Sequence, residues 1–160
     1  MRDLRIRPVR SADDEALAAI IREGMEEFGI CRSDAKADPE LVSVSAAYGG
    51  SRSAYFVVEG GGRVLGGGGI GPIAGQREEI CELRKMYLVA EARGIGAGRR
   101  VLVACLDAAR ELGYKRCHLA TLKSMKRAHA LYAGSGFRRS TYPLPGSGHS
   151  GCDTWYSRDL

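Results

Sequence analysis

The sequence has few of the features that would place it in a specialised class of protein. Its five cysteines are scattered without a Cys-x-x-Cys pair, and only three histidines accompany them. This spacing fits neither a disulfide framework nor a zinc site. No apolar run approaches the roughly 18 residues of a membrane helix, and the charged opening residues precede no apolar signal core. We therefore expect a soluble cytoplasmic protein with no metal and no membrane partner.

Charge of one sign is not concentrated anywhere along the chain. The 24 basic and 19 acidic residues give a net charge of +5, and aromatic residues make up only 7%. A positive excess favours anionic partners, but no block of Lys and Arg or basic stretch interleaved with aromatics occurs. We therefore expect no nucleic-acid partner.

Length and composition indicate one globular domain over residues 1–160. A chain of 160 residues, 44% of them hydrophobic, is long enough to bury a core without disulfides or metals. Hydrophobic periodicity predicts strands at residues 4–9, 54–59, 64–70, 80–89, 116–122, 138–142 and 153–157. It predicts helices after Ser11, at 39–47, from the glycine-rich residues 93–98 up to Leu112, and from Ser124 to Ala133, with both serines as N-caps. This order predicts an α+β fold with a mixed sheet and helices on both faces.

Two glycine-rich segments are candidates for binding phosphate. Residues 66–71 satisfy G-x-G-x-x-G, but Pro72 follows and no helix does, so a closely packed glycine-rich strand is favoured over a dinucleotide site. Residues 93–98 instead lie between a strand and a long helix. Backbone N–H groups and the helix dipole attract an anion at such a position. The segment therefore predicts a phosphate site, with a turn needed only for tight packing as the alternative.

Two further motifs carry a family resemblance. Residues 87–98, YLVAEARGIGAG, resemble the acyl-CoA pyrophosphate motif Q/R-x-x-G-x-G/A of the GNAT superfamily of N-acetyltransferases. Residues 128–137, AHALYAGSGF, resemble its A-x-x-L-Y-x-x-x-G-F segment. The resemblance implies a mostly antiparallel sheet of about seven strands, and acetyl-CoA as the acyl donor. Met125 departs from the family pattern, where an Asn often contacts CoA, and Ser124 or Lys126 could substitute.

The resemblance also implies how the donor binds. Strands 80–89 and 116–122 would splay apart, and CoA would enter the opening. Its pantetheine arm would pair with the backbone of Met86 and Leu88, and the Leu88 N–H would polarise the thioester carbonyl. The pyrophosphate loop would supply the remaining contacts: Arg93, Gly94, Ile95, Gly96, Ala97, Gly98 and Arg99.

Two residues are the candidate catalytic groups. Tyr132 matches the position that protonates the departing thiolate in many family members, and a core tyrosine is the alternative interpretation. Glu82 matches the base position of the histone-acetyltransferase branch, and we expect it to share a strand face with Met86 and Leu88. The alternative for Glu82 is a salt bridge with Arg84 or Lys85.

The acceptor side is predicted from two polar segments. His149 lies in the loop between the last two strands, where an imidazole could act as a base or bind substrate, although loop histidines are more often merely exposed. Arg32 opens the polar stretch 32–38, which is expected to wall the acceptor pocket. Cys152 as a nucleophile is disfavoured because the family transfers the acyl group directly.

The sequence thus predicts an acetyl-CoA-dependent N-acetyltransferase. The mixed charges of residues 32–38 favour a small zwitterionic amine, such as an amino acid, over a basic peptide. A protein lysine or N-terminal acetyltransferase and a non-catalytic acyl-CoA-binding module remain the alternatives. A homodimer is expected from the family, with the strands around Tyr142 and Trp155 as contact elements.

Overall fold

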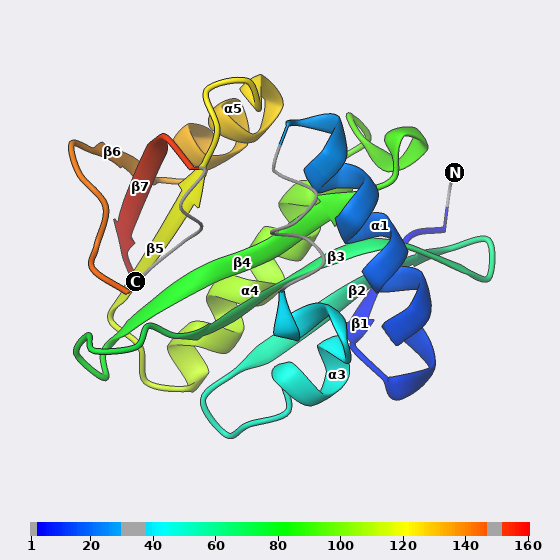
Figure 1. Cartoon of the computed structure of the whole chain (residues 1–160), viewed down its shortest axis with the longest axis horizontal. Coiled ribbons are helices and arrows are strands. Elements are labelled where there is room, and N and C mark those ends of the chain that lie inside the picture. The colour runs from blue at the N-terminus through cyan, green and yellow to red at the C-terminus, as the bar shows by residue number, and fades with distance from the viewer. Residues whose placement is uncertain (1–2, 30–37, 147–151) are drawn as a thin grey trace.

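One seven-stranded sheet organises the molecule, in the strand order β1-β2-β3-β4-β5-β7-β6 (Figure 1). The computed structural model describes residues 3–29, 38–146 and 152–160. Only β4 and β5 pair in parallel, and the other neighbouring strands are antiparallel. The strands are β1 (Arg5–Pro8), β2 (Ala54–Gly60), β3 (Arg63–Pro72), β4 (Ile80–Leu88), β5 (Arg116–Thr121), β6 (Arg138–Ser140) and β7 (Thr154–Asp159). The mixed, mostly antiparallel sheet expected from the sequence is confirmed.

Helices pack on both faces of this sheet and create two separate cores. The helix α1 (Asp14–Glu27) and the short α3 (Val44–Ala47) cover one face, together with Tyr48 and Tyr55. The long α4 (Ala97–Glu111) covers the other face, and α5 (Lys126–Gly134) adds Tyr132 to that core. The apolar stripes of α1 and α4 explain this division, because each helix buries only one side.

Three local predictions about helix boundaries were wrong. Ser11 begins a 3₁₀ turn, Ser11–Asp13, and α1 starts only after it. Ser124 does not cap α5, which begins after Met125 without a side-chain cap. The helix expected at 39–47 is split into a 3₁₀ turn, Pro39–Leu41, and α3, because Ser43 accepts a hydrogen bond from Ala46 N and starts a new helix.

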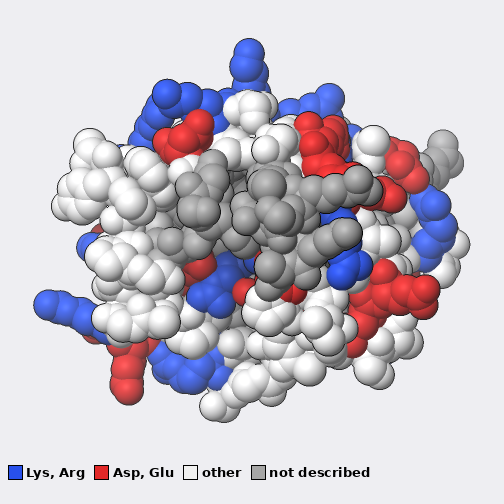
Figure 2. Space-filling model, in the orientation of Figure 1, with Lys and Arg blue, Asp and Glu red and all other residues white. Residues whose placement is uncertain are grey.

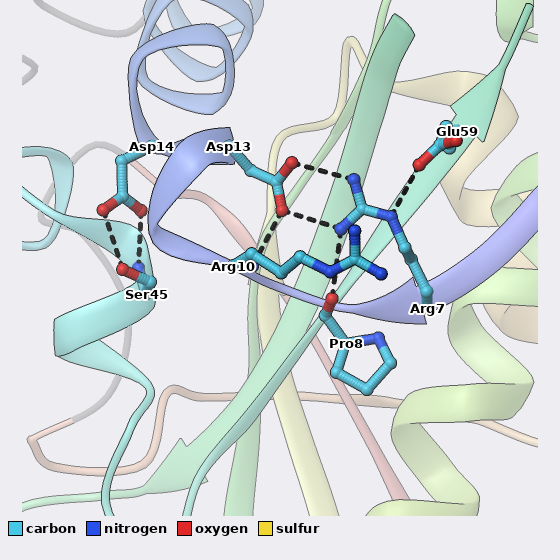
Figure 3. A network of polar contacts seen from close by, with 7 residues as sticks. All are labelled: Arg7, Pro8, Arg10, Asp13, Asp14, Ser45 and Glu59. Carbon is cyan, nitrogen blue, oxygen red and sulfur yellow. Dashed lines mark hydrogen bonds and ion pairs between the residues drawn. The ribbon is translucent and has the colours of Figure 1, made fainter. Parts of the chain in front are cut away.

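The start of α1 is fixed by a partly buried polar network around the buried Asp13 (Figure 3). Arg7 of β1 donates to both carboxylate oxygens of Asp13 at 2.8 Å and to Glu59 of β2 at 2.6 Å. These hydrogen bonds from Arg7 hold the pKa of Asp13 below its usual value. The carboxylate of Asp14 accepts from the N–H and hydroxyl of Ser45, both at 2.7 Å. The network therefore sets the position of α1 relative to the sheet and to α3.

The glycine run at residues 66–71 lies within β3 and is not a dinucleotide loop. A Cβ on Gly67 would lie 2.3 Å from the carbonyl oxygen of Phe56, and one on Gly66 would lie 2.1 Å from that of Tyr87. Both distances are far below van der Waals contact with backbone atoms. Glycine is therefore required here by the close approach of β2 and β4, as the strand interpretation predicted.

We expect Gly67→Ala to lower the free energy of unfolding by about 3 kcal/mol, because the Phe56 backbone cannot move away from the new methyl group. Urea unfolding measures this difference. Gly50→Ala is the matched control, because a Cβ there meets nothing within 4 Å, and we expect a change within about 0.5 kcal/mol. Equal unfolding midpoints for the two variants would contradict the prediction.

Candidate active site

The site begins where the central strands separate. The parallel pairing of β4 with β5 covers only three residue pairs and ends at Glu82 and His118. Beyond these residues β5 continues its pairing with β7, while β4 continues with β3. The splay expected between these strands is thus present, and it opens a space between Met86 on one side and Leu122 on the other.

A β-bulge changes the faces of β4 at this point. Between the pairs Gly67–Tyr87 and Gly69–Arg84, β3 contributes one residue and β4 contributes two. Lys85 adopts the left-handed φ of 51°, and its carbonyl oxygen accepts a hydrogen bond from Tyr55 at 2.9 Å. This backbone conformation is unfavourable for a residue with a side chain, so the contact with Tyr55 helps to maintain it.

The bulge overturns the prediction that Glu82 shares a face with Met86 and Leu88. Strict alternation would place all three together, but the extra residue reverses the alternation after Arg84. Met86 and Leu88 consequently pack in the core under α4, whereas Tyr87 packs in the core under α1. Glu82 is therefore on the opposite side of the sheet from Met86 and Leu88.

The Leu88 N–H is directed toward the opening. The N–H of Val89 donates to Leu65 of β3 at 2.9 Å, and N–H groups alternate between the two edges of a strand. The N–H of Leu88 therefore points to the other edge, from which β5 has diverged. This is the direction that polarising a thioester in the opening requires.

A cleft of about 810 Å³ runs from this opening to the start of α4. Met86 and Leu88 line it at one end, and the loop after β4 lines it at the other. Gly94 and Gly96 adopt φ values of 76° and 87°, which glycine tolerates best. No side chain caps α4, whose first N–H groups lack partners within the helix.

The other residues of the loop contribute unequally. Gly98 and Arg99 line the cleft, whereas Ala97 is fully buried in the core and Ile95 is 47% exposed. Lys126 and Arg127 of α5 line the cleft from the opposite side. Figure 2 shows Lys and Arg side chains gathered at the edge of the molecule where α5 lies. Arg127 was not among the residues predicted from the sequence, because nothing in the chain order shows that α5 faces this loop.

Arg93 lines the cleft but is engaged with protein groups. Its guanidinium forms two contacts with the Glu27 carboxylate, at 2.7 and 2.6 Å, and donates to the Leu88 carbonyl oxygen at 3.0 Å. The hydrogen bonds with Glu27 raise the pKa of Arg93 and lower that of Glu27. The side chain expected to meet the pyrophosphate thus connects α1 with the end of β4.

Tyr132 lies where this cleft meets a second cavity. It lines both spaces, together with Met86, Tyr87 and Met125. Its ring packs 5.8 Å from that of Phe137 and 5.9 Å from that of Tyr156. Burial raises the pKa of the phenol above its usual value, so the hydroxyl keeps its proton across the physiological range. Tyr132 is thus a core residue that also lines both cavities and carries a protonated hydroxyl.

His129 helps to place the helix that carries Tyr132. Its Nδ1 lies 2.7 Å from the Tyr156 hydroxyl and its Nε2 lies 2.8 Å from the Leu122 carbonyl oxygen. A carbonyl oxygen only accepts, so Nε2 carries a proton. These contacts tie α5 to β7 and to the end of β5, one helical turn before Tyr132.

The second cavity, of about 220 Å³, is lined by charged residues of both signs. The Glu82 side chain is 5% exposed there, and its Oε1 accepts from Arg84 Nε at 2.5 Å. The salt bridge named as the alternative for Glu82 is therefore present, with Arg84 as the partner. Burial of the Arg84 guanidinium acts to lower its pKa, but the negative charge of Glu82 outweighs this effect, so the pKa of Arg84 is raised.

A second buried ion pair lies beside the first. Lys85 Nζ is 2.8 Å from Asp38 Oδ2 and 3.9 Å from Glu40 Oε2. Both partners come from the segment that leads into α3, so this segment walls the second cavity. Asp38 belongs to the polar stretch expected to wall the acceptor side, but its pairing with Lys85 was not predicted from the sequence.

His118 on β5 is the register partner of Glu82 on β4, and it was not predicted from the sequence as a site residue. It is 1% exposed, and burial lowers its pKa to about 4. The imidazole is therefore neutral near pH 7 and places no positive charge beside Glu82. Only the register of the parallel strands, which tertiary structure sets, brings these two residues together.

Three residues predicted from the sequence to lie near the acceptor remain: His149, Arg32 and Cys152. His149 and Arg32 lie outside the described residues. Cys152 lines the second cavity, and the described cysteines are free thiols.

Within residues 3–29, 38–146 and 152–160, no group of three or more His, Cys, Asp or Glu could hold a metal ion. In the same part of the chain, no helix is long and apolar enough to cross a membrane.

Comparisons with known proteins identify the family. The model of the acetyltransferase (GNAT) family matches residues 17–137. An uncharacterized N-acetyltransferase of Escherichia coli, YjgM, is 39% identical over 150 residues, which cover 92% of this chain and 90% of that protein. The chain belongs to the GNAT family of acetyltransferases.

Solved structures share the fold at lower identity. A GNAT-family acetyltransferase from Staphylococcus aureus superposes with a TM-score of 0.85 and 20% identity, covering 99% of both chains. A phosphinothricin acetyltransferase of the GNAT superfamily from Sinorhizobium meliloti, in complex with acetyl-CoA, superposes with a TM-score of 0.78. It is 20% identical, over 98% of this chain and 88% of that one. These likenesses show that the chain shares the fold of these acetyltransferases.

Proposed function

We propose that this acetyltransferase moves an acetyl group from acetyl-CoA directly to the primary amine of a small molecule. The observation that carries the proposal is the meeting of two cavities at Tyr132. The larger cleft leads to an uncapped helix N-terminus with cations around it, which suits a pyrophosphate. The smaller cavity presents Glu82 and Glu40, which suit a cationic amine.

The residues divide the chemistry between them. Glu82 takes a proton from the acceptor ammonium, and the neutral nitrogen attacks the thioester carbon. The Leu88 N–H stabilises the negative charge that develops on the carbonyl oxygen. When the carbon–sulfur bond breaks, Tyr132 donates its proton to the thiolate, and the surplus proton of the new amide nitrogen restores the phenol.

A small acceptor is favoured by the size and charge of the second cavity. A cavity of about 220 Å³ suits an amino acid or a similar small amine. Both cations that line it, Arg84 and Lys85, have carboxylate partners. A lysine acceptor in a protein and a non-catalytic module are the competing functions.

The test is the release of free CoA thiol from acetyl-CoA across an acceptor panel. The panel contains amino acids, polyamines, aminoglycosides and lysine peptides. We expect release that depends on a small amine and exceeds that with any lysine peptide by at least about tenfold. Faster reaction with a peptide would favour the protein acetyltransferase. Binding of acetyl-CoA without release would favour the non-catalytic module, and no binding would refute the proposal.

A further inference from the structure

Arg93 connects the end of α1 with the end of β4, and it lies 66 residues after Glu27 in the sequence. Its terminal nitrogens meet both carboxylate oxygens of Glu27, at the last residue of α1. Its guanidinium carbon lies 5.8 Å from the centre of the Phe28 ring. Its Nε donates to the Leu88 carbonyl oxygen at 3.0 Å, at the last residue of β4. The position of the guanidinium is thus set by α1, which is itself fixed by the network in Figure 3.

The contact with Leu88 acts on the edge of β4 that faces the opening. The carbonyl and the N–H of one strand residue point to the same edge, so Arg93 holds the carbonyl of the residue whose N–H faces the thioester. At this edge β5 no longer supplies pairing partners to β4. A side chain therefore does here what a neighbouring strand does elsewhere, which is to fix the orientation of the peptide groups.

We propose that Arg93 is a positioning residue that acts on acetyl transfer through the Leu88 backbone, with Glu27 holding its guanidinium in place. This inference rests on the proposed function, because it assigns Leu88 to the thioester. It replaces the expectation that the Arg93 side chain binds the pyrophosphate. The side chains available for that task are Arg99, Lys126 and Arg127, which line the same cleft.

The test compares two acyl donors, acetyl-CoA and acetyl-pantetheine, which lacks the nucleotide phosphates. We expect Arg93→Gln to lower kcat about tenfold with both donors, because the carbonyl loses a charge-assisted hydrogen bond. We expect Glu27→Gln to lower kcat about threefold with both, and the double variant to be no slower than Arg93→Gln. The KM for acetyl-CoA should change less than twofold in each.

Two control variants bracket this result. Arg127→Gln removes a cation from the cleft and should raise the KM for acetyl-CoA without affecting acetyl-pantetheine. Asp107→Asn removes an exposed ion pair of α4, at 3.1 Å from Arg110, and should change neither donor's kinetics. The ¹³C shift of the Leu88 carbonyl in the free protein gives a readout independent of turnover, and it should move in Arg93→Gln but not in Asp107→Asn.

Three results would overturn the inference. Arg93→Gln could raise the KM for acetyl-CoA alone, which would make Arg93 a phosphate ligand. Arg93→Gln could slow transfer while Glu27→Gln behaves as wild type, which would show that Glu27 does not hold the Arg93 guanidinium in place. An unchanged Leu88 carbonyl shift would show that the contact is not made. A wild-type protein inactive with every acceptor would instead refute the proposed function, and the carbonyl shift would still report on the contact.

Discussion

Tyr132→Phe is expected to lower kcat by about 100-fold or more while leaving the affinity for acetyl-CoA unchanged. General acids contribute about 10²- to 10⁴-fold to such reactions, and the substitution removes only the hydroxyl that carries the proton. The ring would keep its packing against Phe137 and Tyr156, so the core and the cleft wall stay in place. Without the phenol, the thiolate must leave unprotonated or take its proton from water.

The measurement pairs turnover with calorimetric binding of acetyl-CoA. Tyr114→Phe is the matched control, because it also removes a hydroxyl from a buried tyrosine, whose donor bond to the Arg52 carbonyl oxygen is 2.7 Å long. We expect that variant to lose stability and to keep its kcat. Because burial raises the pKa of Tyr132, the wild-type rate should not decline through loss of this proton below about pH 10. Equal kcat in Tyr132→Phe and wild type would exclude the phenol as the acid.

Glu82→Gln is expected to lower kcat/KM by about 100-fold near pH 7. The amide keeps the size of the side chain and an oxygen for the hydrogen bond from Arg84 Nε, but it cannot take a proton. The deficit should shrink as the pH rises toward the pKa of the acceptor amine, because solvent then supplies the neutral nitrogen. A proton acceptor therefore predicts a loss that depends on pH.

A purely structural role for Glu82 predicts something different. If the carboxylate only holds Arg84, the loss in Glu82→Gln would be the same at every pH. Glu79→Gln is the control, because Glu79 is half exposed and pairs with Arg77 at 3.8 Å. A pH-independent deficit, or activity equal to that of the control, would mean that another group or a water path removes the proton.

Much of the fold was predictable because its signals are local. The apolar stripe of α4, the glycines after β4 and the alternation of residues 4–9 around β1 depend on residues close together in sequence. The errors occurred where short-range and long-range effects compete. Ser11 and Ser124 have the chemistry of N-caps, but the network around Asp13 and the contacts of α5 with β7 decide where those helices begin.

Sequence motifs indicate the residues of the candidate site but not their contacts. Two motifs point to Tyr132 and to the loop at residues 94–99, and residues of both line one cleft. The roles of Arg93 and Glu82 depend on partners that composition does not reveal. Glu27 is 66 residues from Arg93, and the pairing of Glu82 on β4 with His118 on β5 depends on strand register.

The sequence by itself determined the family, the order of the elements and the chemical types of the catalytic candidates. These features depend on residue types at fixed spacings, so residues close together in the chain are enough to specify them. Only the tertiary structure decided which side of β4 each side chain occupies. The extra residue at Lys85 reverses the alternation, and a bulge is stabilised by distant groups such as Tyr55. Glu82 therefore lies apart from Met86 and Leu88, because packing across the sheet, and not the local pattern, set the register.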